Sequence, residues 1–381
     1  MSGIYIHIPF CKSRCTYCDF YSTVASPLME RYVAALVSEA HMRISELNGD
    51  SGSTIYIGGG TPSQLPVPLM RSLMSGIRQA VDANEMEWVS AACQEFTVEV
   101  NPDDVTASYI TALAQMGVNR ISMGLQTFDD DLLRLIGRRH TAQQAIQAVR
   151  AIRLAGINNV SIDLIFGLPG QTIEAWRQSL DMALSLHPEH LSAYALSYEP
   201  GTVLWRQREQ GKVREVDEET SVAMYAHLMT AMRRAGYEHY EISNFALPGR
   251  RSRHNSSYWT ETPYLGLGAS AHSYDGQLRR HNPADIVAYV SAIERGESPV
   301  EVETLEPWER YDERVMVTLR TCEGIDMAAI ERDFGPQALQ HLQKAAQPHI
   351  IAGNLRQNDA HLILTQQGIM TSDAIIRDLM F

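Results

Sequence analysis

The sequence predicts an α/β protein, in which a partial (β/α)6 barrel is followed by a small, winged-helix-like α+β domain. Two observations predict the barrel. Short runs rich in β-branched and other apolar residues alternate with longer stretches of helical periodicity, the pattern of parallel strands joined by helices. Polar motifs directly follow five of the six runs, as expected where the carboxyl ends of parallel strands meet in one site.

Six β-rich runs and three clear helical stretches make up the expected barrel. The helical stretches, residues 29–47, 142–156 and 173–186, place apolar residues three and four positions apart. Gly117 and Gly156 stand where a helix would end ahead of the next strand. The strands are expected at Ile4–Ile8, Thr54–Ile57, Phe96–Val100, Arg120–Leu125, Val160–Phe166 and Leu191–Ser197.

The alternation of strands and helices ends after the sixth unit. Residues 241–298 are rich in Gly, Pro, Ser and aromatic residues, and we expect an ordered, loop-rich connecting region that helps to form a site. Helical patterning returns in residues 299–381, where a strand, a turn and a last helix with Ser372 or Thr371 near its N-cap predict the α+β domain. The barrel would occupy residues 1–240.

Composition and charge indicate a protein of a reducing compartment. The 381 residues carry a formal net charge of −13, which argues against non-specific binding to nucleic acid or to an anionic membrane surface. No apolar run reaches the length of a transmembrane span, and no secretory signal is visible ahead of the strand expected at Gly3. Three of the five cysteines are clustered, which favours metal-binding thiols and a cytoplasmic location.

The strongest motif is CKSRCTYC, directly after the first predicted strand. Its spacing lets Cys11, Cys15 and Cys18 reach one face of a tight loop, which suits an iron–sulfur cube. Such a cube normally takes four cysteines, so one iron would keep an open coordination position. The alternative is a zinc-stabilised interaction module completed by His7 or a distant histidine, although zinc sites more often pair their cysteines two residues apart.

Polar residues end four further strands of the expected barrel. GGGTPS at residues 58–63 follows the second strand, and Glu99 with NPDD closes the third. Gln126 ends the fourth strand, while LIFGLPGQT at residues 164–172 ends the fifth behind Asp163. Each motif alone could be an ordinary turn or a solvated strand end. Their common position at the carboxyl ends of the strands predicts one shared site.

Together these motifs resemble a known superfamily. CKSRCTYC has the three-then-two cysteine spacing of the radical S-adenosylmethionine superfamily. YIHIPFCKSRCTYCDF, GGGTPS, SMGLQTF, DLIFGLPGQT and YEISNFA are similar to the oxygen-independent coproporphyrinogen III oxidase-like family, and GLGASAHSY with the carboxyl-terminal segment extends the likeness over nearly the whole chain. The resemblance implies a radical-SAM barrel, a [4Fe–4S] cluster on Cys11, Cys15 and Cys18, and S-adenosylmethionine chelating the open iron.

The resemblance also implies which residues contact S-adenosylmethionine. Tyr5 and Tyr17 would flank the cofactor. Gly59, Gly60 and Thr61 would let the backbone approach its methionine part, because a Cβ atom at the glycines would intrude. The residues that match the family positions for its other polar groups are Glu99, Gln126, Arg138 and Asp163.

Two features separate this chain from the catalytic branch of the family, whose members oxidatively decarboxylate coproporphyrinogen III. The cysteine motif of that branch resembles CxxxCxxCxC, with a fourth cysteine two residues after the third. In this chain Phe20 occupies the position of that fourth cysteine. The catalytic branch also carries an extension before the first strand, whereas only two residues precede Gly3. A radical oxidoreductase acting on a porphyrinogen is therefore the alternative function.

The sequence HNSSYW is similar to the HNxxYW motif of the heme chaperone branch. This likeness implies a carrier that binds heme b and transfers it to acceptor hemoproteins such as respiratory enzymes. His254 would be an axial ligand of the heme iron, and Tyr258 and Trp259 would offer flat apolar surface to the porphyrin. Without the family context His254 would be taken for a solvated loop histidine, and His272 and His281 are alternative ligands.

Overall fold

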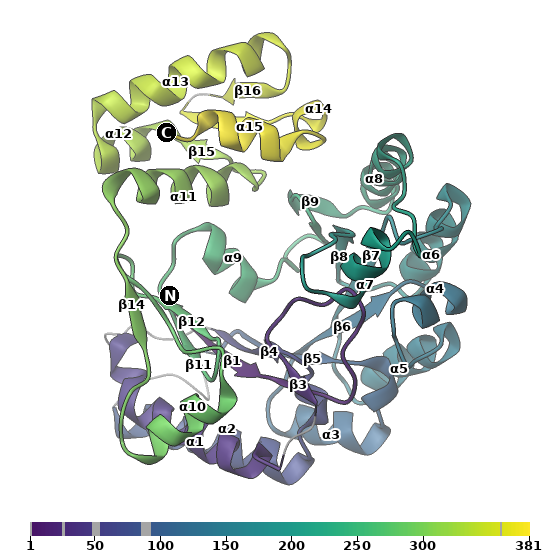
Figure 1. Ribbon diagram of the computed structural model, residues 1–381, viewed down its shortest axis with the longest axis vertical. Helices are drawn as coiled ribbons and strands as arrows, with labels where there is room; N and C mark the ends of the chain where they lie inside the picture. Colours follow the sequence, from purple (N-terminus) through teal and green to yellow (C-terminus); the bar gives the residue numbers. More distant parts are fainter. Residues whose placement is uncertain (1, 25–26, 48–53, 85–92, 359) are drawn as a thin grey trace.

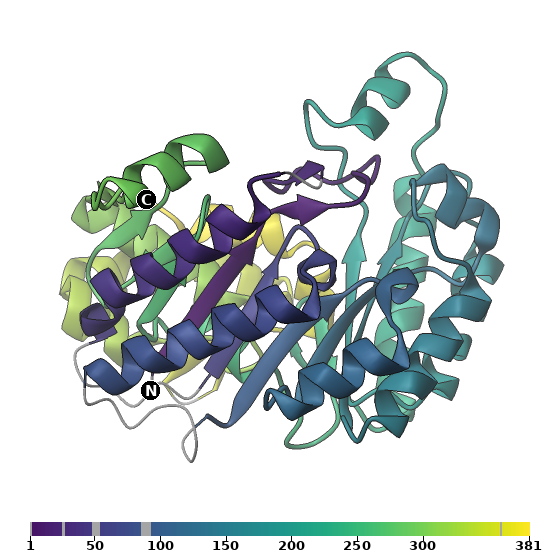
Figure 2. The same ribbon diagram turned by 90° about the horizontal axis from the view of Figure 1, so that it is seen from below.

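A single twelve-stranded sheet forms the main body of the protein and curves into a partial barrel, with helices on its outer face (Figures 1 and 2). The computed structural model describes residues 2–24, 27–47, 54–84, 93–358 and 360–381. The α/β class and the partial barrel predicted from the sequence are confirmed. No helix in these described ranges is long and apolar enough to cross a membrane.

The six predicted strands are the parallel centre of this sheet, and they neighbour one another in chain order. Because all six run in the same direction, their carboxyl ends lie at one rim of the barrel. The strands are β1 (Gly3–Ile8), β4 (Thr54–Gly59), β5 (Glu95–Val100), β6 (Arg120–Gln126), β7 (Asn159–Phe166) and β8 (His190–Ala195).

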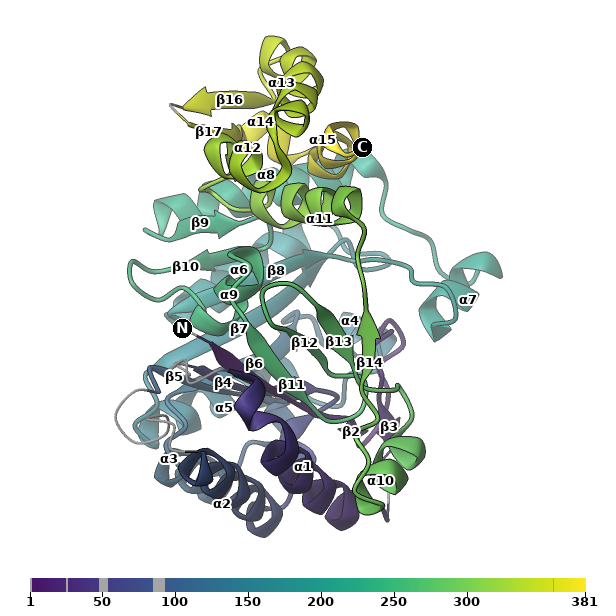
Figure 3. The ribbon, with the colours of Figure 1, turned by 90° about the vertical axis from the view of Figure 1, so that its left-hand side faces the viewer.

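Helices connect these strands and cover the outer face of the sheet, where Figure 2 shows those of the amino-terminal half side by side. Thr106, Thr141 and Thr172 start three of them by accepting a backbone N–H bond at the N-cap. The helices are α1 (Met29–Arg43), α2 (Val67–Ala83), α3 (Ala107–Gln115), α4 (Asp130–Leu135), α5 (Ala142–Leu154), α6 (Ile173–Ser185), α7 (Val203–Glu209) and α8 (Glu218–Arg234). Of these, α7 stands away from the barrel (Figure 3).

Several short 3-10 helices complete the connections. The stretch predicted as one helix over residues 29–47 is α-helical to Arg43 and continues as a 3-10 helix at Ile44–Leu47. Two more, Pro62–Gln64 and Pro102–Asp104, directly follow β4 and β5. Proline suits the first position of such a helix, because its φ is already helical and its missing N–H would have had no partner.

Alternation along the barrel strands separates an apolar outer face from a polar inner wall. In β1, Ile4, Ile6 and Ile8 are fully buried and belong to the hydrophobic core beneath the helices. Tyr5 and His7 lie between them and point to the opposite face, because successive side chains of a strand alternate. The main core therefore lies between sheet and helices, and the interior of the barrel is left for polar groups.

Residues 241–298 are more regular than the loop-rich region that their composition predicts. β11 pairs with β1 in parallel, and three antiparallel strands extend the sheet beyond it. These strands have only three or four residues, too few for a clear alternation, so their pairing with the barrel creates them. The elements within this region and at its two borders are β9 (Glu238–Glu241), β10 (Asn244–Ala246), α9 (Arg253–Trp259), β11 (Tyr264–Leu267), β12 (His272–Tyr274), β13 (Arg279–His281), α10 (Ile286–Glu294) and β14 (Glu301–Glu303).

The carboxyl-terminal residues form a second, separate hydrophobic cluster. Helix, strand, two helices and two strands follow one another, which is the order of a winged helix and agrees with the predicted α+β fold. Thr371 directly precedes the last helix. The elements are α11 (Pro307–Leu319), β15 (Ile325–Asp326), α12 (Met327–Phe334), α13 (Pro336–Ile351), β16 (Leu355–Asn358), β17 (His361–Leu364), α14 (Gln366–Ile369) and α15 (Ser372–Leu379).

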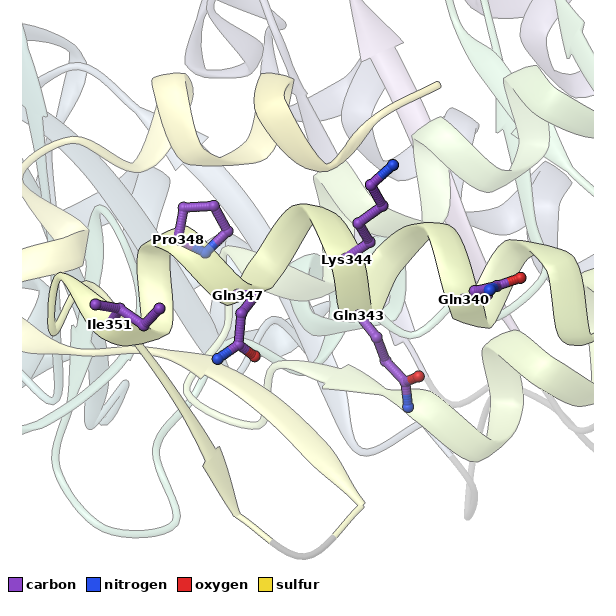
Figure 4. Close-up of a pocket in the computed structure, with 6 residues that line it drawn as sticks. All are labelled: Gln340, Gln343, Lys344, Gln347, Pro348 and Ile351. Carbon is purple, nitrogen blue, oxygen red and sulfur yellow. The ribbon is translucent and has the colours of Figure 1, made fainter.

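The outer surface of α13 has a shallow depression formed by this helix alone (Figure 4). Three glutamines line it together with Pro348 and Ile351, and Lys344 is its only charged side chain. Ile351, at the end of the helix, is 77% exposed. No part of the barrel contributes to this depression, so it is not the site that the strand ends predict.

A buried carboxylate ties α1 to the edge of the barrel. Glu39 is fully buried and accepts hydrogen bonds from Arg43 Nη1 at 2.7 Å, Gly268 N at 2.8 Å, Asn282 Nδ2 at 2.7 Å and Tyr289 OH at 2.7 Å. These donors come from α1, the end of β11, the segment after β13, and α10. One carboxylate thus joins four parts of the chain.

Replacing Glu39 with Ala is expected to lower the free energy of unfolding by about 3–5 kcal/mol, because Arg43 would be left as a buried charge without its innermost partner. The matched control is Glu46→Ala, which removes the partly exposed second partner of Arg43 and should cost at most about 1 kcal/mol. Urea denaturation of both variants measures the difference. Equal losses would show that the buried carboxylate has no special role.

Candidate functional site

A cavity of about 460 Å³ opens at the carboxyl ends of the barrel strands and extends into the barrel. Its wall combines the cysteine loop, the turn after β4, the inner faces of β5 to β8, and Asn255 of α9. The predicted residues that line it are Cys11, Cys15, Tyr17, Cys18, Gly59, Gly60, Thr61, Glu99, Gln126, Arg138 and Asp163. Tyr5, His254, Tyr258 and Trp259 are not part of this wall.

Backbone hydrogen bonds hold the cysteine loop in place, both where its two ends pair with each other and at its middle. β2 (Phe10–Cys11) pairs in parallel with β3 (Thr23–Val24) and so closes the loop. Between them, the N–H of Thr16 donates to the carbonyl of Ile136 at 3.0 Å, and its carbonyl accepts from Leu204 N at 2.8 Å. The loop is thus attached to the end of α4 and to the start of α7.

Each of the three thiols faces the cavity in a different environment. Cys11 Sγ lies 3.5 Å from Thr61 Oγ1, and Cys15 Sγ accepts a hydrogen bond from Arg138 Nη1 at 3.6 Å. Burial raises the pKa of the Cys18 thiol to about 11. Cys18 is therefore protonated at neutral pH without a metal, and ligation would release this proton.

His7, a candidate for the fourth ligand of a zinc ion at the cysteine loop, is hydrogen-bonded to other groups. Its Nδ1 lies 3.0 Å from Tyr5 OH, and its Nε2 lies 3.1 Å from the carbonyl oxygen of Tyr21. In the part of the chain that the structure describes, no three His, Cys, Asp or Glu side chains converge to hold a single ion. An iron–sulfur cube places each cysteine on a different iron, so it does not need such convergence.

The glycines after β4 are required by the packing of the chain itself. Gly59 has φ +109°, and a Cβ atom there would lie 2.5 Å from the His7 ring. A Cβ atom at Gly60 would lie 2.8 Å from the carbonyl carbon of Pro9. The sequence predicts that these glycines let a cofactor approach the backbone. In the structure they are already needed for the end of β4 to pack closely against the end of β1. The same lack of side chains leaves the backbone uncovered on the cavity wall.

Two buried carboxylates face the cavity. Glu99 accepts hydrogen bonds from Tyr56 OH at 2.7 Å and from Gly59 N at 3.2 Å, and burial raises its pKa to about 7. Asp163 accepts a hydrogen bond from Ser122 Oγ at 3.3 Å, and burial raises its pKa as well. Carboxylates in this position can accept hydrogen bonds from hydroxyl or ammonium groups of a ligand.

Gln126 and Arg138 both line the rim of the cavity, and Arg138 connects this rim to the cysteine loop. Gln126 has φ +71° and lies where the pairing of β6 with β7 shifts register. Arg138 donates to Asn101 Oδ1 at 2.8 Å, to the carbonyl of Gly124 and to the sulfur of Cys15. A positive charge is therefore held beside one of the three thiols.

His254 is fully buried inside the barrel, contrary to the appearance of a solvated loop histidine. Its Nδ1 lies 2.9 Å from Thr54 Oγ1, its Nε2 lies 2.9 Å from Tyr258 OH, and its ring stacks on Tyr56 with 5.2 Å between centroids. Burial lowers its pKa to about 3, so the imidazole is neutral. Both ring nitrogens are occupied, and neither is free to bind a metal in this conformation.

The remaining candidates for heme binding lie apart from the cavity. Trp259 has the guanidinium of Arg320 5.7 Å from its ring centre, which links α9 to the end of α11. His272 and His281 lie opposite each other on β12 and β13, with 5.5 Å between stacked ring centroids. His281 Nε2 is also 3.4 Å from Glu301 Oε2. The two alternative histidines thus form a pair, separate from α9.

The inner wall contains polar residues that the strand-end motifs did not indicate. Arg120, Ser122, Ser192 and Tyr194 line the cavity from β6 and β8, and Asn255 lines it from α9. A signal was available in the sequence, because these residues occupy alternate positions of strands that are otherwise apolar. A parallel strand that is buried on both faces normally has a continuous run of apolar residues in its sequence, so polar residues at alternate positions indicate a polar inner face.

The barrel, the cysteine loop and the carboxyl-terminal cluster define a radical SAM protein. Residues 5–183 match the Radical SAM superfamily, and residues 305–371 match the HemN C-terminal domain. The solved structure of coproporphyrinogen III oxidase (HemN) from Escherichia coli aligns with a TM-score of 0.83, covering 99% of this chain and 89% of that chain at 22% identity. At this identity the alignment establishes the shared fold.

Curated relatives narrow the class further. The heme chaperone HemW of Bacillus subtilis is 35% identical over 98% of both chains. Heme chaperone HemW of Lactococcus lactis is 37% identical over 87% of this chain and 85% of the relative, and that of Escherichia coli is 36% identical over 73% and 72%. The chain belongs to the heme chaperone HemW family.

Replacing Cys15 with Ala is expected to abolish the absorbance near ~410 nm that iron–sulfur clusters show after anaerobic reconstitution, because one of three thiolate ligands is lost. Cys93→Ala and Cys322→Ala are matched controls, since neither residue lines the cavity. Both controls should reconstitute like the wild type. A normal cluster spectrum in Cys15→Ala would remove this residue from the ligand set.

Proposed function

We propose that this protein is a cytoplasmic heme chaperone that binds heme b, a [4Fe–4S] cluster and S-adenosylmethionine and transfers heme to acceptor hemoproteins such as respiratory enzymes. The observation that carries this proposal is the likeness to curated heme chaperones along 98% of the chain. The HNSSYW motif on α9 supports it, because this helix supplies a histidine and two aromatic rings together.

The cavity fits the two resident cofactors of the proposal. Cys11, Cys15 and Cys18 reach its mouth on one anchored loop and would hold the cluster. The bare backbone of Gly59 and the carboxylate of Glu99 lie beside this mouth and would receive the polar parts of S-adenosylmethionine. When bound at the open iron, the cofactor supplies a sulfonium that a reduced cluster can cleave.

Heme ligation by His254 requires a movement of α9. Besides the bonds of its imidazole, His254 donates its backbone N–H to Glu95 at 3.0 Å, and Arg253 N donates to the same carboxylate at 2.9 Å. Helix α9 packs between β4 and α11 (Figure 1). We propose that α9 turns outward to expose His254, Tyr258 and Trp259 to heme.

The cavity and the heme motif share α9. Asn255 lies on the cavity wall, whereas the neighbouring His254 is engaged with Thr54 and Tyr258. An outward turn of α9 would therefore remove Asn255 from the wall. We propose that occupancy of the cavity and exposure of the heme motif are coupled through this one helix.

The second candidate is a radical oxidoreductase acting on a porphyrinogen, and the observation that favours it is the retained cofactor cavity. Phe20 weighs against it. This side chain is 66% exposed at the cavity wall, and it occupies the position of the fourth cysteine in the motif of the catalytic branch. An anaerobic assay with coproporphyrinogen III, a reductant and S-adenosylmethionine separates the two. We expect no release of carbon dioxide by reconstituted protein that binds heme, and sustained release would establish the oxidoreductase.

Titration of the purified protein with heme is expected to give a saturable Soret band, and His254→Ala should weaken binding by at least about tenfold, equivalent to ~1.4 kcal/mol. His41→Ala is the matched control, because His41 is an exposed histidine on α1. Thr54→Val removes one bond that keeps His254 inside and should speed heme association.

Two outcomes would change these assignments. Unchanged binding by His254→Ala, with loss of binding in His272→Ala or His281→Ala, would transfer the ligand to the histidine pair on β12 and β13. Absence of heme binding by the wild type would contradict the chaperone proposal itself.

A further inference from the structure

The barrel interior contains a buried arginine without a charged partner. Arg120 is 1% exposed and is the first residue of β6, where it pairs in register with Thr97 and Asn159. Its Nη1 lies 3.5 Å from Thr97 Oγ1, and its Nε has no hydrogen-bond partner among the described residues. No carboxylate oxygen of those residues lies within 4.0 Å of the guanidinium.

The groups around Arg120 do not neutralise it by direct pairing. Glu99 is bonded to Tyr56 OH and Gly59 N. Asp163 is bonded to Ser122. The nearby imidazoles of His190 and His254 are neutral, because burial, followed by the positive charge of Arg120, lowers the pKa of each. Glu99 and Asp163 act on Arg120 only through space: burial raises the pKa of both carboxylates, and the charge of Arg120 lowers it against this effect. A buried guanidinium without a directly bonded acceptor for its charge is costly, so its retention at a cavity wall points to a ligand that completes it.

Arg120 lies deep in the cavity, far from the cysteine loop. It begins β6 and Gln126 ends that strand, which separates their backbones by about 20 Å at the usual rise of a β-strand. Asn255 of α9 lines the same cavity. Its backbone N–H donates a hydrogen bond to Ser252 Oγ, whereas its carboxamide makes none with the residues that the structure describes. Arg120, a cation, and Asn255, a neutral hydrogen-bond donor, thus both line the cavity. Neither is among the residues implied for binding the cofactors.

We propose that the inner end of the cavity is a carboxylate-binding subsite, in which Arg120 binds the carboxylate of a small organic acid and Asn255 donates a further hydrogen bond. Guanidinium matches a carboxylate in shape and can donate two parallel bonds to it. A monovalent anion fits the single cation. A phosphate dianion would face the nearby carboxylates of Glu99 and Asp163 with only one cation to offset its charge.

Acetate is the probe for this subsite. The methyl proton signal of acetate is recorded at constant ionic strength as the purified protein is added, and saturable line broadening reports binding. We expect broadening with the wild type, and binding at least about tenfold weaker with Arg120→Gln. Arg150→Gln is the matched control, because Arg150 is exposed on α5, and it should behave like the wild type. Equal concentrations of inorganic phosphate should not displace the acetate.

Two further variants keep the test decisive if Arg120→Gln does not fold, as judged by circular dichroism. Arg120→Lys retains the charge but loses the paired donors, and Asn255→Leu removes the carboxamide. Each should weaken acetate binding by about three- to tenfold. Equal binding by wild type and folded Arg120 variants, absence of saturable broadening with the wild type, or displacement by phosphate would overturn the proposal. Because the experiment uses neither heme nor iron, its result is independent of the chaperone function.

Discussion

The alternation of side chains along six parallel strands is the constraint on which the rest of the structure depends. One set, such as Ile4, Ile6 and Ile8, packs against the helices and stabilises the barrel. The other set faces inward and includes Glu99 and Asp163, which line the cavity. Burial on one face thus provides the stability that lets the other face remain polar.

The polar interior links features that lie far apart in the sequence. Glu95, at the start of β5, accepts the first N–H groups of α9, and Tyr56 stacks on His254 from the same helix. The wall that begins at the cysteine loop therefore ends at α9, where Asn255 completes it. This arrangement is the physical basis of the proposed coupling between occupancy of the cavity and movement of α9.

The fold is shared with an enzyme, but the function follows from particular side chains placed on it. Coproporphyrinogen III oxidase from Escherichia coli has the same architecture at 22% identity. The features that distinguish this chain are local: Phe20 after the third cysteine, and HNSSYW on a helix held between barrel and carboxyl-terminal cluster. The proposed carrier function on a radical SAM scaffold therefore depends on these local residues and not on the fold.

The sequence alone determined the six barrel strands, the winged-helix-like end and the residues at the strand ends, because period-two patterns, cysteine spacing and glycine turns are local properties. Only the tertiary structure decided the rest. The short strand β11 exists through its pairing with β1. His254 is buried, and Arg120 has no directly bonded carboxylate among the described residues, because the barrel wall surrounds both side chains. Burial and the distance between residues remote in the chain depend on packing, which a local pattern does not encode.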